Sequence, residues 1–351
     1  MIASATQRIR VLIVEDSAVT REFLLHLLSR DRLFQIVGTA QNGLEGVEQA
    51  ERLRPDVILM DVYMPRMNGY EATRQIMERV PSPIVMVSAN FNRDEVAMTF
   101  EALKAGALAV VEKHGGPDHP KHAETTRLLL QTVRLMAEVK VVRRWPKRKH
   151  PVPPTPVPAK ADQRIRLIAI GASTGGPGVV AEILAGLPTA PPILVVQHIA
   201  PGFTTGLAEW LNRGTRLEVK LAKSGEAVRS GTVYLAAEGL QMGITREGRI
   251  RLASEPAEDG FCPSATYLFH SVAESYGRSA IGILLTGMGR DGATGLHQLL
   301  QAGGVTIVQD EESSVVFGMP AEAIRLGAAE YVLSPEEISG TIRSLVTQGK
   351  R

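Results

Sequence analysis

The sequence contains 351 residues, of which 44% are hydrophobic, and it carries a formal net charge of +2. This length is sufficient for two domains, and the small charge argues against strong overall attraction to nucleic acid. The one cysteine, Cys262, excludes an internal disulfide and a cysteine-rich metal site. No apolar run approaches the ~20 residues that span a bilayer, and residues 1–10 lack the core of a secretion signal. We therefore expect a cytoplasmic protein with no membrane insertion.

Short apolar runs alternate with amphipathic segments over residues 1–120. Strands are predicted at 11–14, 34–39, 57–60, 84–87 and 108–111. Helices are expected near 17–30, 44–53, 69–78 and 94–104, the first of them capped by Ser17. Five strand–helix units in so short a stretch predict an α/β domain with a parallel, doubly wound sheet.

Polar side chains follow the strands of this predicted sheet, and parallel strands end at the same edge. The residues are Glu15, Asp16, Asp61, Ser88 and Lys113. Each alone could be a loop or cap residue, but the five together indicate a site. Three clustered carboxylates repel one another, and a hard cation such as Mg²⁺ would relieve that repulsion. The lysine and the serine hydroxyl suit a phosphoryl group carried by one of the acids.

This region resembles the receiver domain of bacterial response regulators. The resemblance rests on Glu15-Asp16, Asp61 within the segment 60–65, Asn68-Gly69, Ser88 and Lys113. It implies that Asp61 accepts phosphate from a histidine kinase. It also implies Mg²⁺ bound by Glu15, Asp16, Asp61 and the carbonyl of Tyr63. Two positions depart from the family pattern, because His114 stands where proline is usual and Val110 where an aromatic residue is usual.

Residues 121–163 are predicted to form an outgoing helix and a linker between residues 1–120 and a second domain at 164–351. The segment 125–142 has helical spacing, 143–150 is strongly basic and 151–158 is rich in proline. The basic run could contact nucleic acid or an acidic surface. A solvated, stiff tether is the favoured interpretation, since proline-rich segments are extended spacers.

The second domain again alternates strands and helices. Strands are expected at 165–170, 193–196, 280–285 and 304–308, with antiparallel hairpins over 217–254. Helices are expected at 179–187, 203–211, 264–276, after 292 to 302, and 335–346. The pattern predicts a second doubly wound α/β domain, Rossmann-like with added hairpins.

The turn Gly171-Ala-Ser-Thr-Gly-Gly-Pro177 follows the first of these strands. Its glycines could indicate a dinucleotide-binding loop, which also needs an acid about 20 residues further on. Here that position carries His198, no acid lies between Glu182 and Glu209, and Pro177 lacks an N–H donor. Both observations weaken the nucleotide hypothesis.

The same turn favours a hydrolase. If the first two strands are neighbours, Ser173 and His198 leave adjacent carboxyl ends, where an imidazole can take the serine proton. Asp291, in a glycine-rich loop, is the best placed third member by location. Thr174 and the Met288 loop are suitably placed to stabilise an oxyanion. Taken singly, these residues could equally be a helix cap, a strand-end histidine and a turn aspartate.

Together the two domains resemble the chemotaxis protein-glutamate methylesterases, the CheB family. The resemblance rests on the segments 171–177, 197–203, 285–292 and 302–320. It implies a triad of Ser173, His198 and Asp291, with the Met288 N–H as oxyanion donor and Thr174 assisting. It also implies hydrolysis of glutamate methyl esters on chemoreceptors, often with deamidation of receptor glutamines. Departures at Gln241 and Cys262 could alter which receptor or adapter is the partner.

Two functional hypotheses follow. The first is a phosphorylation-gated esterase acting on methyl-accepting chemoreceptors, monomeric, with no cofactor for the esterase and Mg²⁺ in the receiver. The second is a receiver-controlled, non-enzymatic signalling module with a degenerate catalytic domain. A DNA-binding effector is a weaker third hypothesis, because the second domain shows no separate basic recognition helix.

Overall fold

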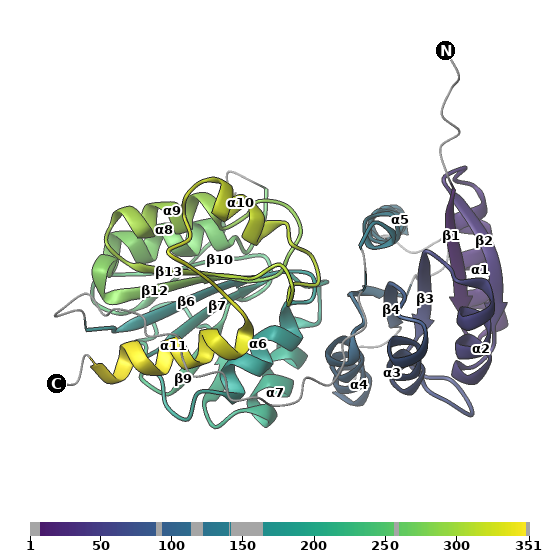
Figure 1. Cartoon of the computed structure of the whole chain (residues 1–351), viewed down its shortest axis with the longest axis horizontal. Coiled ribbons are helices and arrows are strands. Elements are labelled where there is room, and N and C mark those ends of the chain that lie inside the picture. Colours follow the sequence, from purple (N-terminus) through teal and green to yellow (C-terminus); the bar gives the residue numbers. More distant parts are fainter. Residues whose placement is uncertain are drawn as a thin grey trace, which may run out of the picture. The chain divides into compact units, whose positions relative to one another are not determined.

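The computed structural model describes residues 8–88, 93–113, 122–139, 141, 164–255 and 260–348. The chain divides into two compact units, Met1–Arg148 and Lys149–Arg351 (Figure 1). Of the predicted outgoing helix and tether, only residues 122–139 and 141 lie within the described part. Within the described residues, no helix is both long enough and apolar enough to cross a membrane.

The N-terminal unit contains a five-stranded, wholly parallel sheet in the order β2-β1-β3-β4-β5. The strands are β1 Ile9–Val14, β2 Phe34–Ala40, β3 Val57–Asp61, β4 Ile84–Ser88 and β5 Ala109–Glu112. This is the flavodoxin-like order, with a switch point between β1 and β3. The predicted parallel, doubly wound sheet is confirmed.

Five helices connect and cover this sheet: α1 Ala18–Ser29, α2 Gly43–Leu53, α3 Gly69–Arg79, α4 Arg93–Ala105 and α5 His122–Ala137. Helices α2, α3 and α4 lie side by side (Figure 1). The predicted Ser17 cap is present, since its side chain accepts a hydrogen bond from the N–H of Thr20. Asn68 and Glu71 form a reciprocal capping box that begins α3 directly after the β3 loop.

The C-terminal unit contains a seven-stranded parallel sheet in the order β14-β13-β12-β6-β7-β9-β8. The strands are β6 Leu167–Ala172, β7 Ile193–Gln197, β8 Glu218–Leu221, β9 Thr232–Leu235, β12 Ala280–Leu284, β13 Val305–Gln309 and β14 Tyr331–Leu333. Helices α8 Ala265–Ser275, α9 Ala293–Gln301 and α10 Met319–Arg325 cover one face, and α6 Gly176–Ala185, α7 Thr204–Gly214 and α11 Pro335–Gln348 cover the other (Figure 1). The short elements α10 and β14 were not predicted from the sequence.

The prediction of antiparallel hairpins over residues 217–254 was right for only half of that segment. Strands β10 Gln241–Ile244 and β11 Ile250–Ala253 do form an antiparallel pair, which packs on α8. Strands β8 and β9 instead pair in parallel with each other, and β9 pairs in parallel with β7. Both strands are only four residues long and their connection is rich in glycine, which is also the pattern of a hairpin.

Strand β6 lies in the centre of the larger sheet and all six of its residues are buried. It pairs with β7 on one side and with β12 on the other. Full burial on both faces explains why its sequence is a continuous apolar run rather than an alternating one. The carboxyl end of β6 therefore meets the carboxyl ends of both neighbours, which places three loops around one point.

Candidate active site

Ser173 follows β6 directly and lies at the start of a sharp turn. Its N–H donates to the carbonyl of Thr286 at 3.0 Å, and its carbonyl accepts from the N–H of Gly176 at 2.8 Å. Gly175 caps α6 with a φ of 78°, and a Cβ there would lie 2.5 Å from the side chain of Val315. Only glycine fits that position, because the conformation is left-handed and the space is filled. The turn leaves the Ser173 side chain half-buried at the edge of the sheet.

His198 lies in register with Ser173 on the neighbouring strand. Ala172 pairs with Gln197, and the N–H of His198 donates to the carbonyl of Ala172 at 2.9 Å. The two residues that follow this pair are Ser173 and His198, so the predicted adjacency of the two strands is confirmed. The amide of Gln197 fixes the two turns together, since Nε2 donates to the carbonyls of Ser173 and His198, both at 2.8 Å.

The imidazole of His198 contacts the carboxylate of Asp291. Nε2 lies 2.9 Å from Asp291 Oδ2, and the Asp291 side chain is fully buried. Because Nε2 faces this carboxylate, Nδ1 is the nitrogen left to serve the Ser173 hydroxyl. Both ring nitrogens are buried, and within the described residues neither makes a hydrogen bond of standard geometry, although Nε2 is in close contact with the carboxylate. No hydrogen bond joins the Ser173 hydroxyl to the ring in this part of the chain, and such contacts often tighten only when substrate binds.

Three donors from the start of α8 surround the Asp291 carboxylate. The Ser264 hydroxyl donates at 2.7 Å, the N–H of Ala265 at 2.7 Å and the N–H of Thr266 at 3.0 Å. Burial alone would raise the pKa of Asp291, but its contacts with His198, Thr266 and Ser264 lower that pKa well below its ordinary value. The carboxylate therefore stays ionised and can stabilise an imidazolium. Apart from a helix predicted to begin at Ser264, these donors could not be predicted from the sequence.

The loop that carries Met288 passes directly beside Ser173. A Cβ on Gly287 would lie 2.7 Å from the Cβ of Ser173. The loop is fixed on both sides, because the N–H of Gly287 donates to Val316 and its carbonyl accepts from Met319 at 2.9 Å. Among the described residues, no acceptor engages the backbone N–H of Thr174 or of Met288. Both N–H groups therefore remain available beside the serine.

The same geometry argues against a dinucleotide in this turn. The N–H of Gly176 is used by the Ser173 carbonyl, and a Cβ on Gly176 would lie 2.3 Å from Gln197 Oε1. The side chain of Val315 packs against Gly175. A pyrophosphate-binding loop needs free N–H donors and open space in front of its glycines. Here the space in front of both glycines is occupied by side chains of the chain itself.

The N-terminal unit places its predicted cluster at the carboxyl edge of its own sheet. Ligand oxygens of Glu15, Asp16 and Asp61 lie within 4.8 Å of one another. Lys113 Nζ lies 2.8 Å from Asp61 Oδ2 and 3.1 Å from Glu15 Oε2. Ser88 ends β4 beside this group and is buried, and its carbonyl accepts from the N–H of Lys113. Tyr63 follows Asp61 by two residues and is partly exposed.

Glu15 and Asp61 are hard to ionise together. Burial, followed by the neighbouring Asp61, raises the pKa of Glu15 to about 7. Burial is also the main cause of the raised pKa of Asp61, against the opposing effect of Lys113. Burial opposes the charge of Lys113 too, but Asp61 and Glu15 raise its pKa. Closely spaced carboxylate oxygens with raised pKa values fit a hard divalent cation such as Mg²⁺.

Comparisons with known proteins match both halves of the chain. The CheB methylesterase family model matches residues 168–342, and the response regulator receiver domain model matches residues 11–125. The chain is 49% identical over 345 residues to protein-glutamate methylesterase/protein-glutamine glutaminase 4 of Geobacter metallireducens, covering 97% of this chain and 99% of that protein. It is 48% identical over 346 residues to the corresponding protein 1 of Syntrophus aciditrophicus, covering 96% and 98%.

The chain belongs to the protein-glutamate methylesterase/protein-glutamine glutaminase family. The solved catalytic domain of the Thermotoga maritima CheB methylesterase matches with a TM-score of 0.50 and 37% identity, over 52% of this chain and 99% of that one. The resemblance inferred from the sequence is therefore confirmed, for the receiver half as well as for the methylesterase half.

The departures from the family pattern have different structural settings. Val110 is buried within β5, and His114 lies outside the described residues. Cys262 is exposed, on the segment between β11 and α8. Gln241 is fully buried at the start of β10.

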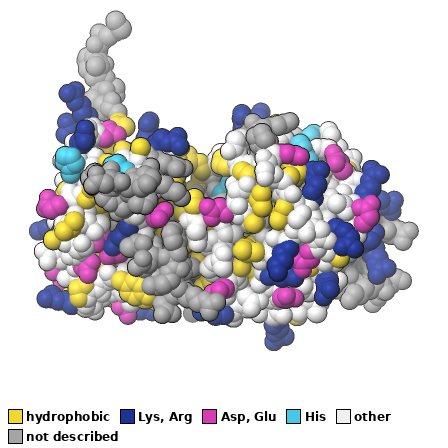
Figure 2. Space-filling model, turned by 180° about the vertical axis from the view of Figure 1, so that it is seen from behind, with side chains coloured by type: hydrophobic (Ala, Val, Ile, Leu, Met, Phe, Trp, Pro, Cys, Tyr) yellow, Lys and Arg dark blue, Asp and Glu magenta, His cyan; other side chains and the backbone are white. Residues whose placement is uncertain are grey.

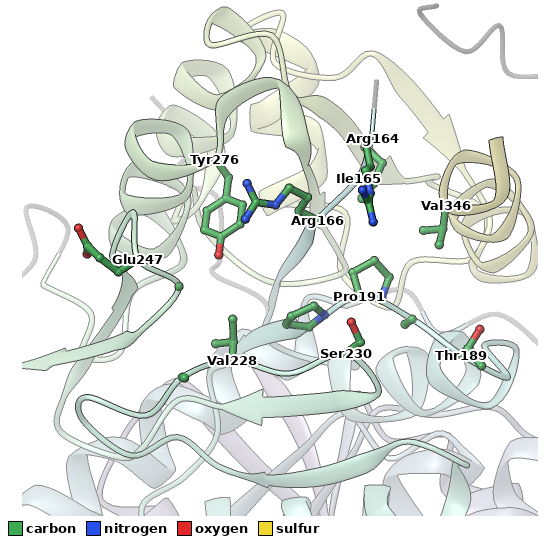
Figure 3. Close-up of a pocket in the computed structure, with 14 residues that line it drawn as sticks. Arg164, Ile165, Arg166, Thr189, Pro191, Val228, Ser230, Glu247, Tyr276 and Val346 are labelled. Atoms are coloured by element: carbon green, nitrogen blue, oxygen red, sulfur yellow. The ribbon is translucent and has the colours of Figure 1, made fainter. Parts of the chain in front are cut away.

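A hollow lies at the end of the methylesterase sheet opposite to Ser173 and His198. It has a volume of about 780 Å³ and lies beside the residues that precede β6 and β7, including Arg166 and Pro192. Figure 3 shows the Arg166 side chain beside the Tyr276 ring, and its guanidinium carbon lies 5.6 Å from the ring centroid. Neither Ser173, His198 nor Asp291 lines this hollow. Ser173, His198 and Asp291 lie at the other end of the sheet.

Proposed function

We propose that the chain hydrolyses glutamate γ-methyl esters of chemoreceptors, releasing methanol, and deamidates receptor glutamines by the same route. The observation that carries this proposal is the His198–Asp291 contact at 2.9 Å beside a serine in register with the histidine. Residues 164–351 form the catalytic domain in this proposal, 1–120 the receiver, and 121–163 the helix and tether between them.

In the first half of the reaction, Ser173 Oγ attacks the ester carbonyl while His198 Nδ1 accepts the hydroxyl proton. The N–H groups of Met288 and Thr174 stabilise the negative charge that develops on the carbonyl oxygen. Asp291, held ionised by its donors, stabilises the imidazolium and keeps Nε2 protonated. The imidazolium then gives its proton to the departing methoxy oxygen, and methanol leaves an acyl-serine.

In the second half, water attacks the acyl-serine while His198 accepts one of its protons. Collapse of the second tetrahedral species returns that proton to Ser173 and releases the glutamate carboxylate. An amide substrate follows the same steps with ammonia as the leaving group. All of the groups needed for both halves come from the loops that follow β6, β7 and β12, so the catalytic half needs no cofactor.

The receiver domain regulates the esterase activity. In this proposal Asp61 accepts a phosphoryl group from a histidine kinase, and Ser88 and Lys113 contact it. Glu15, Asp16, Asp61 and the Tyr63 carbonyl would hold Mg²⁺, which neutralises charge between the acids and the phosphate when bound. Converting the Asp61 carboxylate, with a charge of −1, to an acyl phosphate with a charge of about −2 adds about one negative charge to this edge, and it reorders the Ser88 end of β4. That change relieves inhibition of the esterase.

The experiment measures methanol release from methyl-labelled receptor membranes by the full chain. The unmodified chain should release methanol steadily, and Ser173→Ala should lower the rate by at least about 10³-fold. A small-molecule phosphodonor with Mg²⁺ should raise the rate of the unmodified chain but not that of Asp61→Asn. Persistent release by Ser173→Ala would remove the serine from the mechanism. A total lack of release would favour the non-enzymatic module, and an equal rate with and without phosphodonor would reject the gating.

A further inference from the structure

The imidazole of His198 is stacked against the ring of Phe261. The two ring centroids are 4.6 Å apart and the planes are inclined by only 3°. Phe261 is a large hydrophobic residue that is nevertheless exposed, at 39%. One face of its ring therefore covers the imidazole while much of the rest faces solvent. The Phe261 side chain is therefore packed against the histidine and is not part of the buried core.

The side chain of Gln241 anchors the backbone of Phe261. The Gln241 amide is fully buried, its Nε2 donates to the Phe261 carbonyl at 2.7 Å, and its Oε1 accepts from the N–H of Ser264 at 2.8 Å. One side chain thus holds both ends of the segment 261–264. Buried amide hydrogen bonds of this kind fix a loop firmly, because leaving either partner unpaired is unfavourable.

The same segment reaches both members of the imidazole–carboxylate pair. Phe261 contacts the ring of His198, and Ser264 donates to Asp291 at 2.7 Å. On the side of the nucleophile, by contrast, no hydrogen bond from Ser173 restrains the ring in the described residues, and Nδ1 has no partner. A ring held only by one carboxylate can still turn about its Cβ–Cγ bond and out of line with the serine.

We propose that Phe261 is a positioning residue for His198 and that Gln241 is its anchor. The stack holds the imidazole in the plane in which Nε2 faces Asp291 and Nδ1 is presented to Ser173 before substrate arrives. This inference rests on the proposed esterase function. It assigns Phe261 no proton transfer and no direct bond to the reacting ester. Its contribution is to kcat, through the fraction of molecules whose imidazole is correctly oriented.

The test compares two substitutions at one position, using methanol release by the full chain. The unmodified chain and Ser173→Ala are measured first, so that a failure of the esterase function is seen separately. Phe261→Leu keeps apolar volume but removes the flat ring, and should lower kcat about tenfold with KM changed by less than about twofold. Phe261→Tyr keeps the ring and should retain kcat within about twofold. Tyr331→Leu, which removes a ring at the far edge of the same sheet, is the matched control and should leave kcat unchanged.

Three results would overturn the positioning role. One is an unchanged kcat in Phe261→Leu, and another is a rise in KM alone, which would make Phe261 a substrate contact. The third is an equal loss of kcat in Phe261→Tyr and Phe261→Leu. Thermal unfolding of each variant identifies any change that merely destabilises the domain.

The anchor has its own test in a double substitution. If Gln241 acts through Phe261, then Gln241→Met combined with Phe261→Leu should lower kcat by less than the product of the two single effects. A full product would remove Gln241 from the proposal and leave Phe261 standing. If Gln241→Met fails to fold, the Phe261 variants alone test the positioning role. They should fold, because Phe261 is partly exposed and its replacement opens no sealed cavity.

Discussion

Two aspartates at equivalent edges of two parallel sheets have opposite titration behaviour in this chain. Asp61 ends β3 of the receiver and Asp291 lies in the loop after β12 of the methylesterase half. Both are almost fully buried, at 4% and 0% exposure. Burial raises the pKa of Asp61, whereas contacts with His198 and with donors at the start of α8 lower the pKa of Asp291 despite its burial.

The opposite pKa shifts of the two aspartates come from their neighbours and not from a difference in burial. Asp61 shares its edge with two further acids and receives one backbone N–H, from Val62 at 2.7 Å, together with Lys113. Among the described residues, no other acid contacts Asp291, which accepts hydrogen bonds from two backbone N–H groups and one hydroxyl and contacts the imidazole. The first environment favours a carboxylate that binds a cation and accepts a phosphoryl group. The second favours a permanent anion that steadies a transient positive charge.

The largest expected effect comes from neutralising the permanent anion. Asp291→Asn should lower kcat for methanol release by about 10⁴-fold, because the histidine loses both its partner and its preferred tautomer. Asp310→Asn makes the same change after the neighbouring strand β13, at the same edge of the sheet, and should leave kcat within a few fold of the unmodified chain. An Asp291→Asn variant that is folded by circular dichroism and still active would show that the histidine acts without the carboxylate.

A smaller effect is expected from removing one donor from Asp291. Ser264→Ala deletes the hydroxyl bond at 2.7 Å and the cap that accepts from Tyr267, while the two backbone donors remain. We expect kcat to fall about tenfold, since a hydrogen bond to a charged group contributes about 1.5–3 kcal/mol.

The matched control for this change is Ser271→Ala in the same helix. Its hydroxyl bonds the carbonyl of Leu268 and the N–H of Ile244, with no contact to Asp291. Ser271→Ala should lower the melting temperature. At assay temperatures well below the unfolding transition, it should leave kcat unchanged. If both variants lose kcat equally, the effect of Ser264 is structural and the donor count around Asp291 is not what matters.

Much of this arrangement was accessible from the sequence because it follows chain-local patterns. Buried parallel strands are continuous apolar runs, and the residues that end them fall at one edge, which brought Ser173 beside His198 and Lys113 beside Asp61. The pairing of β8 with β9 in parallel was not accessible, because short strands between glycines have the same pattern in a hairpin. The links from Gln241 to Phe261 and from Ser264 to Asp291 join residues 20 and 27 positions apart. No periodicity marks such contacts, since they depend on how β10 and the loop after β12 pack against the start of α8.

The smallest expected effect concerns the stability of the receiver, whose dependence on pH should change sign when Mg²⁺ is added. The pKa of Glu15 is raised from 4.5 to about 7 in the folded state, so the fold binds a proton that the unfolded chain has already released. Without divalent cations, the free energy of unfolding of the receiver should therefore fall as pH rises between these two values. Mg²⁺ binds the deprotonated acids, so the stabilisation that it adds should grow over the same range. Hydrogen exchange of peptides covering β1 and β3 in the full chain, corrected for intrinsic rates, measures both trends.

Substitution of Glu15 separates this cause from a general effect of pH. Glu15→Gln removes the titrating group, so the trend without cations should flatten and the stabilisation by Mg²⁺ should shrink. Glu78→Gln, on the exposed side of α3, removes an acid of the same type and should change neither trend. Equal slopes in the unmodified chain and in Glu15→Gln would mean that Glu15 titrates normally. In that case Glu15 would be ionised at neutral pH, as Asp291 is. The contrast between a receiver site that titrates and a methylesterase site that stays ionised would then be wrong.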